Sequence, residues 1–454
     1  MKKYVMLIIA ALFVQLVFAQ KIINVESVES VGFSPERLKR IDDAMNDWVK
    51  QGWMNGAVGM IIRDGKIVYY KAAGYNDIDA KIPLPKDDIF RIASQTKAIT
   101  SVAVMMLYEE GKFLLDDPVS KYIPSFSHEQ VLDKFNETDS SYTTVPAKRD
   151  VTIRDLLTHT SGIDYAQIGS KEAKAIYAKN NITAGLDVHN DKLSDAMNRL
   201  GSLPLLHQPG EKWTYGLNID LLGDLIEIWS GMTLDEFFHK RIFEPLGMND
   251  SYFNVPKEKE NRLVNLYQED SLGHLIKQSG EALGVDVNYP LRTKTYFSGG
   301  GGLSSTIYDY AIFLQMLLNG GEYNGKRLLS RNTVRIMTMN QIGDIDFGNN
   351  KFGLGFAIVT EKSSGESPSQ AGTFSWGGAF STSYWVDPKE KMIVQFYRQL
   401  WGTTHGDLSE KFKVLAYSAL NDCKFCKYKL KNTIVLFFIH EKNIFQIIND
   451  DKKS

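Results

Sequence analysis

The stretch Phe90-Arg91-Ile92-Ala93-Ser94-Gln95-Thr96-Lys97 holds a serine and a lysine three residues apart, at the start of a helical pattern. That pattern continues to Gly111, which is a typical helix stop. Residues three apart on a helix share a face, so the Lys97 amine can reach the Ser94 hydroxyl. A serine becomes a good nucleophile when a nearby base takes its proton, and an amine in a desolvated pocket can serve as that base. The spacing therefore predicts Ser94 as nucleophile and Lys97 as base, although a Ser-x-x-Lys in a chain of this length also arises by chance.

Length and composition are those of a globular protein. The chain has 454 residues, of which 43% are apolar and 23% charged, with a formal net charge of -2. This length suffices for two domains or for one large domain with an insertion. The charge excludes the basic surface that nucleic-acid binding requires.

The first 19 residues have the pattern of a secretory signal peptide. Lys2 and Lys3 precede an apolar run from Val5 to Phe18, and Ala19 ends a small-residue cleavage site. The run is short for a transmembrane span, so an uncleaved anchor is the lesser alternative. We therefore expect a mature protein that is periplasmic or secreted and has no stable membrane anchor.

Residues 423–454 differ in composition from the rest of the chain and are predicted to be a C-terminal appendage without a function of their own. They contain the chain's two cysteines, Cys423 and Cys426. A Cys-x-x-Cys can be a redox motif or half of a zinc site. Because no second ligand pair and no thioredoxin-like strand accompany it, we interpret the pair as incidental.

The N-terminal part predicts a helix followed by a hairpin. Ser34-Pro35 is a typical helix start and Gly52 a typical stop, and Asp64-Gly65 separates two apolar runs. A helix followed by antiparallel strands favours an α+β layer. Residues 125–150 are polar with little periodicity, which predicts a loop-rich region.

The middle of the chain, from 170 to 250, is helical in pattern. Before it, Val151–Gly162 predicts a short helix that stops at Gly162. Its His159 could be a general base, but we interpret it as a hydrogen-bonded structural histidine because Lys97 already supplies a base. Tyr215 follows a Pro-Gly turn and precedes a helix predicted from Asp220 to Ser230.

Four glycines, Gly299 to Gly302, could indicate a phosphate loop, but no Gly-Lys-Ser/Thr follows them. A tight backbone crossing is the better interpretation. An amphipathic helix is predicted for Tyr308–Leu318. Strand-like runs then follow, and the fold closes with a helix from about Leu408 to Asn421; the runs are 353–360, 373–376, 383–386 and 392–397.

Three separated motifs, Ser94-x-x-Lys97, Tyr215 and Trp376-Gly377-Gly378-Ala379, resemble those of the serine β-lactamase-like superfamily. That superfamily includes class C β-lactamases, D-alanyl-D-alanine carboxypeptidases and related esterases. The resemblance covers roughly residues 30–422. It implies an antiparallel sheet flanked by helices, formed by a discontinuous catalytic domain, with a mostly helical insertion; the catalytic domain would comprise 20–112 and 296–422, and the insertion 113–295.

The resemblance also implies a role for each residue of the motifs. Ser94 would form an acyl-enzyme, while Lys97 and Tyr215 share its proton and pass it to the leaving group. The N–H groups of Ser94 and Ala379 would form an oxyanion hole. Gly377 and Gly378 would let the strand lie close to the substrate.

Two positions depart from the lactamase pattern. Trp376 stands where lactamases and their relatives have Lys, His or Arg, and Leu217 stands where they have Asn; Asn218 is one residue further along. Both departures are similar to the carboxylesterase branch. Simple core packing is the alternative for Trp376.

Together these features predict an exported serine hydrolase acting on a small ester or acyl substrate, without metal or cofactor. A β-lactamase or D-alanyl-D-alanine carboxypeptidase remains an alternative within the superfamily. A catalytically silent peptidoglycan-fragment binding protein is an alternative from another class.

Overall fold

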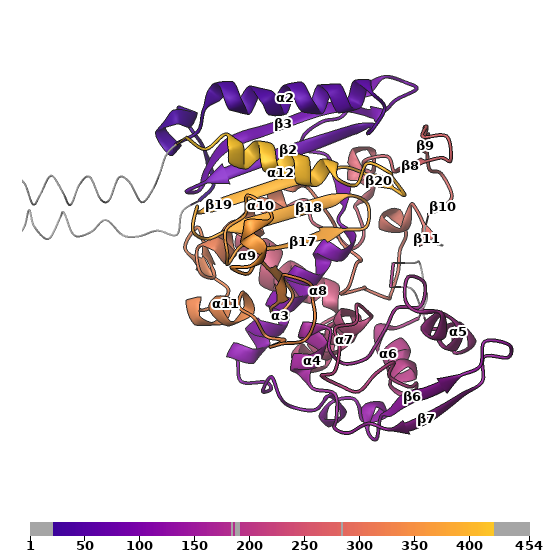
Figure 1. Ribbon diagram of the computed structural model, residues 1–454. Helices are drawn as coiled ribbons and strands as arrows, with labels where there is room; N and C mark the ends of the chain where they lie inside the picture. The colour runs from indigo at the N-terminus through magenta and orange to yellow at the C-terminus, as the bar shows by residue number, and fades with distance from the viewer. Residues whose placement is uncertain (1–20, 183–184, 187–190, 283–284, 422–454) are drawn as a thin grey trace, which may run out of the picture.

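The computed structural model describes residues 21–182, 185–186, 191–282 and 285–421 (Figure 1). The predicted signal peptide and the whole predicted appendage, with Cys423 and Cys426, lie outside these residues. Within the described part of the chain, no helix is long and apolar enough to cross a membrane.

A nine-stranded sheet forms the centre of the fold, in the order β1-β3-β2-β19-β18-β17-β16-β15, with β4 paired to β3. Except for β1 and β3, which are parallel, these strands pair in antiparallel fashion. The strands are β1 (Ile23–Asn24), β2 (Gly56–Arg63), β3 (Lys66–Asp77), β4 (Ile82–Pro83), β15 (Lys351–Phe352), β16 (Ala357–Ile358), β17 (Phe374–Gly378), β18 (Thr382–Asp387) and β19 (Met392–Tyr397).

The predicted hairpin and first helix are confirmed. Asp64 and Gly65 both have positive φ, 51° and 72°, as a two-residue type I′ turn requires, and they join β2 to β3. The helix α2 (Pro35–Lys50) begins with proline, and the Ser34 side chain accepts a hydrogen bond from the Arg37 N–H. Local turn and capping chemistry therefore sets this part of the fold.

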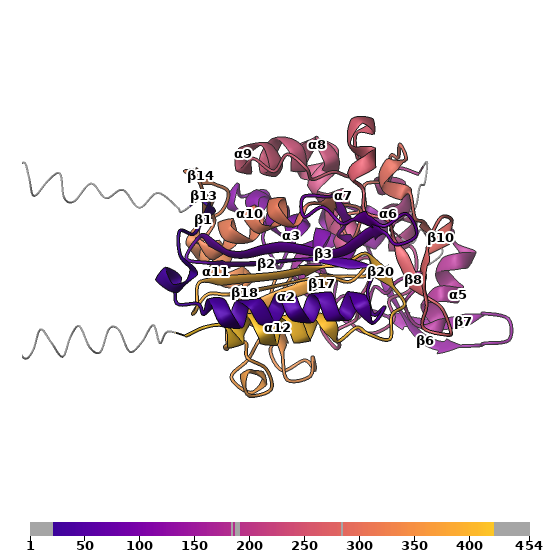
Figure 2. The same ribbon diagram turned by 90° about the horizontal axis from the view of Figure 1, so that it is seen from above.

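Helices cover both faces of the sheet (Figure 2). On one face lie α2 and α12 (Leu408–Ser418), whose Phe412 stacks on Phe396 of β19 with ring centroids 4.7 Å apart. On the other face lie α3 (Thr96–Glu109) and α10 (Ile307–Leu318). The predicted α+β class is confirmed by this layering.

The segment between residues 113 and 295 contributes no strand to the nine-stranded sheet in its described part. In Figure 1, its helices α4 to α7 lie below β17, the lowest labelled strand of that sheet. One buried apolar cluster joins both parts of the molecule, because it contains Val58 of β2 as well as Leu156 and Phe356. The division into two domains stays a prediction. The helices are α4 (Ile153–Thr158), α5 (Lys171–Lys179), α6 (Leu193–Gly201), α7 (Asn218–Ser230), α8 (Leu234–Phe238) and α9 (Glu244–Leu246).

Three sequence-based expectations need correction. The polar region 125–150 contains a hairpin, β6 (Gln130–Phe135) and β7 (Tyr142–Pro146), whose largely exposed strands lack an apolar alternation that would reveal them. The helix α10 is not amphipathic, because it is buried on nearly all sides. The short helix α4 ends at His159 in a left-handed conformation, not at Gly162.

Candidate active site

Ser94 lies in a tight turn, Ala93–Gln95, between β5 (Phe90–Arg91) and α3. The turn includes Ala93 at a φ of +42°, a conformation that non-glycine residues rarely adopt and that costs about 1–3 kcal/mol. The surrounding structure holds the turn in place, since the buried Arg91 donates hydrogen bonds to the carbonyls of Val264 and Val287, each at 2.7 Å. Such strain is common at functional sites.

Lys97 is only 2% exposed, and its Nζ lies at the centre of the site. It donates to the Gly300 carbonyl at 2.6 Å and to the Tyr165 hydroxyl at 2.8 Å. Nζ is 3.4 Å from the Ser94 Oγ, as the three-residue spacing requires. The structure thus brings the predicted nucleophile and the predicted base within hydrogen-bonding distance.

Tyr215 packs on the same amine. Lys97 Nζ is 4.5 Å from the centroid of the Tyr215 ring, within the range of a cation–π contact. The Tyr215 oxygen accepts a hydrogen bond from Trp376 Nε1 at 3.4 Å. The predicted partner of Lys97 is therefore adjacent to it, although Lys97 donates a hydrogen bond to the hydroxyl of Tyr165 and not to that of Tyr215.

Sequence reasoning missed Tyr165, because neither its spacing nor a local motif marks it. Its ring centroid lies 5.2 Å from that of Tyr215, and the side chain is buried. Burial raises the pKa of Tyr165 well above its ordinary value, and the neighbouring Tyr215 and Asp220 raise it further. Tyr165 is therefore a neutral phenol that accepts from Lys97.

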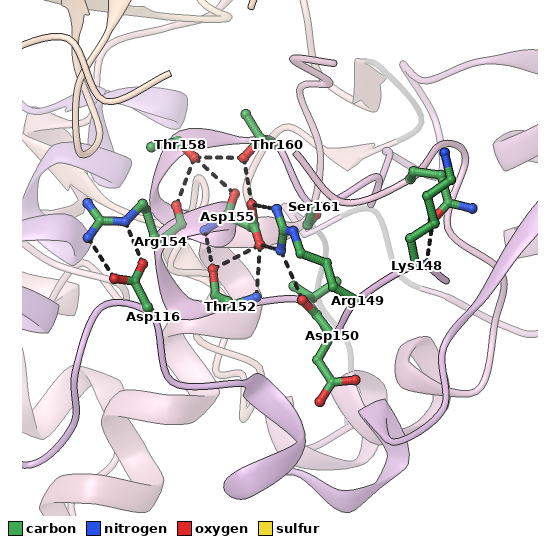
Figure 3. Close-up of polar contacts among 12 residues, drawn as sticks. Asp116, Lys148, Arg149, Asp150, Thr152, Arg154, Asp155, Thr158, Thr160 and Ser161 are labelled. Atoms are coloured by element: carbon green, nitrogen blue, oxygen red, sulfur yellow. Dashed lines mark hydrogen bonds and ion pairs between the residues drawn. The ribbon is translucent and has the colours of Figure 1, made fainter. Parts of the chain in front are cut away.

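A polar network around Asp155 fixes the segment that leads to Tyr165 (Figure 3). The Asp155 carboxylate accepts two hydrogen bonds from Arg149, at 2.5 and 2.9 Å, and one from Thr160 at 3.0 Å. It also completes a capping box with Thr152 at the start of α4. These bonds hold the start of the helix and the turn that follows it.

His159 and Asn218 connect this turn to α7, the helix that follows Tyr215. Asn218 Nδ2 and His159 Nδ1 are 3.0 Å apart, and Ser161 Oγ donates to Asn218 Oδ1 at 2.5 Å. Burial lowers the pKa of His159 well below its usual value, and the charge of Lys97 lowers it further. These contacts are those of a structural histidine. They also occupy the Asn218 amide, so it does not stand in for the lactamase asparagine.

The strand β17 carries Trp376, Gly377 and Gly378 past the nucleophile. A Cβ on Gly378 would lie 2.3 Å from the Ile92 carbonyl oxygen, so only glycine allows this approach. Ala379 follows the strand and borders the same cavity as Ser94. Within the described residues, no turn or loop hydrogen bond engages the N–H of Ser94 or Ala379. The oxyanion hole formed by these two N–H groups stays a prediction.

Trp376 belongs to a half-buried aromatic group beside Tyr215, rather than to the interior alone. Its ring centroid is 5.6 Å from that of Tyr215 and 6.4 Å from that of Trp213. Leu217, in contrast, is fully buried. The site therefore presents an indole where lactamases present a cation.

A cavity of about 110 Å³ lies against Ser94 and is lined mainly by apolar atoms. Its lining includes Tyr165, Leu186, Asp220, Val285, Ala379 and Trp401.

The glycine run, Gly299 to Gly302, crosses α7 near this cavity. A Cβ on Gly299 would lie 2.7 Å from the Ile219 carbonyl oxygen, so the predicted tight crossing is confirmed.

The fold and the grouping of Ser94 with Lys97 define a protein of the serine β-lactamase-like class. The family model described as Beta-lactamase matches residues 40–417, and the chain belongs to that family. The predicted β-lactamase/transpeptidase-like fold is confirmed by solved structures. EstCE1, a hydrolase with promiscuous acyltransferase activity, has a TM-score of 0.71 at 25% identity, covering 85% of this chain and 98% of EstCE1. Simvastatin synthase (LovD) from Aspergillus terreus also has a TM-score of 0.71, at 24% identity over 85% of this chain and 99% of LovD.

Curated relatives place the chain among the hydrolases of this family. Protein Rv1367c of Mycobacterium tuberculosis is 34% identical, over 77% of this chain and 86% of that protein. Esterase EstB of Burkholderia gladioli is 30% identical over 77% of this chain and 86% of EstB. The lovastatin esterase of Penicillium rubens is 30% identical over 82% of this chain and 96% of that enzyme.

Proposed function

We propose that this protein is an exported serine hydrolase that cleaves small carboxylic esters through an acyl-enzyme on Ser94. The observation that carries the proposal is the contact of Ser94 Oγ with the buried Lys97 amine, beside an apolar cavity. The family relatives named as esterases support an ester substrate.

In the proposed reaction, Ser94 Oγ attacks the ester carbonyl and gives its proton to the unit formed by Lys97 and Tyr215. The Lys97 cation and the Trp376 N–H would stabilise Tyr215 as the phenolate that accepts this proton, and the transfer neutralises the Tyr215 oxygen. The unit then protonates the departing alcohol oxygen. In the second half, water attacks the acyl-enzyme and the unit accepts its proton. The acyl C–O bond then breaks, the unit returns the proton to Ser94 Oγ, and the carboxylic acid is released.

The N–H groups of Ser94 and Ala379 would stabilise the tetrahedral oxyanion, and one such donor is typically worth about 3 kcal/mol of barrier.

The volume of the cavity limits the size of the acyl group that can enter it. An apolar cavity of about 150 Å³ holds a benzene molecule. The cavity of about 110 Å³ therefore suits a short acyl group.

Esters are preferred over β-lactams in this proposal because of Trp376. A β-lactam brings a carboxylate that requires a cation or strong donor, whereas Trp376 offers one indole N–H and no charge. That N–H is already directed at Tyr215. A missing charge-assisted hydrogen bond costs roughly 1.5–3 kcal/mol, about ten- to a hundred-fold in rate.

A panel of nitrophenyl acetate, nitrophenyl butyrate and a chromogenic cephalosporin tests the proposal. We expect the mature protein to have a higher kcat/KM for the esters, and Ser94→Ala to have none. Trp376→Lys should raise the lactam-to-ester ratio. A cephalosporin kcat/KM equal to or above that for the esters would refute the ester assignment, and no turnover or serine labelling would favour a silent binding protein.

Export is the second part of the proposal and rests on the sequence of residues 1–19. The positive Lys2 and Lys3, the apolar run and Ala19 support cleavage after Ala19. N-terminal sequencing of protein expressed with its leader in a bacterium should give Gln20 as the first residue of periplasmic or secreted material. Uncleaved protein in the membrane fraction would support the anchor alternative.

A further inference from the structure

Asp220 is a buried carboxylate in the first turn of α7, close to the proposed catalytic centre. It is only 1% exposed. Its Oδ1 accepts from Ser298 Oγ at 2.6 Å and from the Tyr296 hydroxyl at 3.4 Å. Its Oδ2 accepts no hydrogen bond among the described residues. A buried charge with so few partners requires compensation from a nearby opposite charge.

Lys97 supplies that charge across Gly300. A Cβ on Gly300 would lie 2.4 Å from Asp220 Oδ2 and 3.5 Å from Lys97 Nζ, so the two atoms lie within about 6 Å of one another. Burial raises the pKa of Asp220, while the hydrogen bond from Ser298 and the charge of Lys97 act in the opposite direction. Gly300 itself accepts the shortest hydrogen bond of Lys97.

We propose that Asp220 is a positioning residue that acts through Lys97 in the proposed acyl transfer. Its carboxylate stabilises the Lys97 ammonium and, through Ser298, holds the glycine crossing so that the Gly300 carbonyl receives the Lys97 N–H. Asp220 borders the cavity but is too buried for substrate contact to be its main role. The inference rests on the function proposed above.

Several titratable groups surround Lys97 and Asp220, and Asp220 is the carboxylate among them. Lys97 is faced by Tyr165, Tyr215, His159 and Asp220. Asp220 is faced by Lys97, Tyr165 and Tyr296. Asp220 is thus the one carboxylate facing Lys97 among these groups. Without it, the Lys97 ammonium loses a stabilising opposite charge.

A matched pair of variants on one helix tests this role. Asp220→Asn keeps the shape of the side chain and removes the charge. Asp224→Asn is the control, because Asp224 lies one turn further along α7, is also 1% exposed, and has both carboxylate oxygens without a hydrogen-bond partner in the described structure. Burial raises the pKa of Asp224, and the charges of Glu227 and Asp195 raise it further, whereas Lys97 is not among these causes.

The measurements are the melting temperature and the pH dependence of kcat/KM for nitrophenyl butyrate between pH 6 and 9.5, with the full chain. We expect Asp220→Asn to lose at least tenfold in kcat/KM at pH 8.5 and to move the alkaline limb about one pH unit lower. Its melting temperature should stay near that of Asp224→Asn, whose pH profile should match the wild type.

Ser298→Ala is a second variant in case Asp220→Asn does not fold. It removes the 2.6 Å donor to Asp220 and should move the alkaline limb in the same direction by less. An unchanged profile, an equal shift in Asp224→Asn, or movement of the acidic limb instead would overturn the inference. Wild type without ester turnover or Ser94 labelling would refute the proposed function itself, so the two failures are distinguishable.

Discussion

At the scale of single residues, the site depends on the several contacts of one amine. Lys97 Nζ reaches Gly300, Tyr165 and Ser94 from one position and lies over the Tyr215 ring. Residues that share a proton in this way act as a unit, and their titrations are coupled. Their contributions to catalysis should therefore not be additive.

A double-mutant cycle tests this coupling. Lys97→Ala and Tyr215→Phe should each lower kcat/KM for nitrophenyl butyrate at least a hundredfold, about 3 kcal/mol or more. The double variant should be little worse than the poorer single variant, because either change already disables proton transfer. Losses that add fully would show that the two residues have separate tasks.

His159 should make stability depend on pH. Its pKa is held well below the usual value in the folded protein, so it stays neutral while the unfolded chain takes up a proton near pH 6.5. The unfolded state then binds more protons, so this contribution to stability is present above about pH 6.5 and is lost as the pH falls.

We expect the free energy of unfolding to decrease between pH 6.5 and 5.5 more steeply in the wild type than in His159→Gln, by up to about 1.4 kcal/mol per pH unit. Denaturant titrations at each pH measure this slope. The exposed His239 provides the control, in the variant His239→Gln. Equal slopes in all three proteins would contradict a neutral His159.

Contacts between residues close in sequence could be predicted, and contacts made through tertiary packing could not. Ser94 and Lys97 could be paired from sequence because one helical turn fixes their distance. Tyr165 and Asp220 could not, because they reach Lys97 only through the packing of α3 against α7 and the turn after α4. The sequence contains no periodicity that encodes such contacts.

At the scale of elements, Gly378 allows β17 to lie close to the turn that carries Ser94. The predicted role of Gly377 and Gly378 differs between the two positions in the structure. A Cβ on Gly378 would meet the Ile92 carbonyl at 2.3 Å and Thr382 Oγ1 at 2.4 Å, whereas a Cβ on Gly377 would meet its nearest atom, the Thr382 carbonyl oxygen, at 3.1 Å. A backbone carbonyl next to the nucleophile cannot move away without disturbing the site.

Gly378→Ala should therefore lower ester kcat/KM at least tenfold and also lower the melting temperature, because β17 must shift away from the Ser94 turn. Gly377→Ala should have a clearly smaller effect on both. Kinetics and thermal unfolding of the two purified variants measure the difference. Equal losses would mean that the close approach at Gly378 does not set the geometry.

Elements with a strong local signal were predicted well, and weakly marked ones were not. The β2–β3 hairpin follows from Asp64-Gly65, whose turn type admits few residues. The β6–β7 hairpin was missed because its exposed strands need no apolar face. α10 was assigned the wrong pattern because a helix enclosed on nearly all sides has no polar stripe.

At the scale of the whole molecule, the two ends of the described chain meet in the sheet. β2 pairs with β19 and α12 packs beside α2, and the chain after α12 continues this contact in the bridge between Leu420 and Phe33. The α+β layering follows from sequence, whereas the pairing of strands more than 300 residues apart does not.

Deletion of residues 423–454 should leave ester kcat/KM within about twofold and the melting temperature within a few degrees. The reason is the change of composition after the closing helix. Thermal unfolding and ester kinetics of the truncated chain check this. Lost activity or a fall of many degrees would show that these residues stabilise the fold.

The most direct test of the account is the position of the covalent bond. After reaction with a fluorophosphonate, trypsin should release Ile92–Lys97, a peptide with a single serine, since Arg91 and Lys97 are cleavage sites. We predict one adduct per chain, located by tandem mass spectrometry on Ser94, and none in Ser94→Ala, which should keep the wild-type melting temperature. An adduct on another residue, or labelling that persists in Ser94→Ala, would contradict Ser94 as the nucleophile.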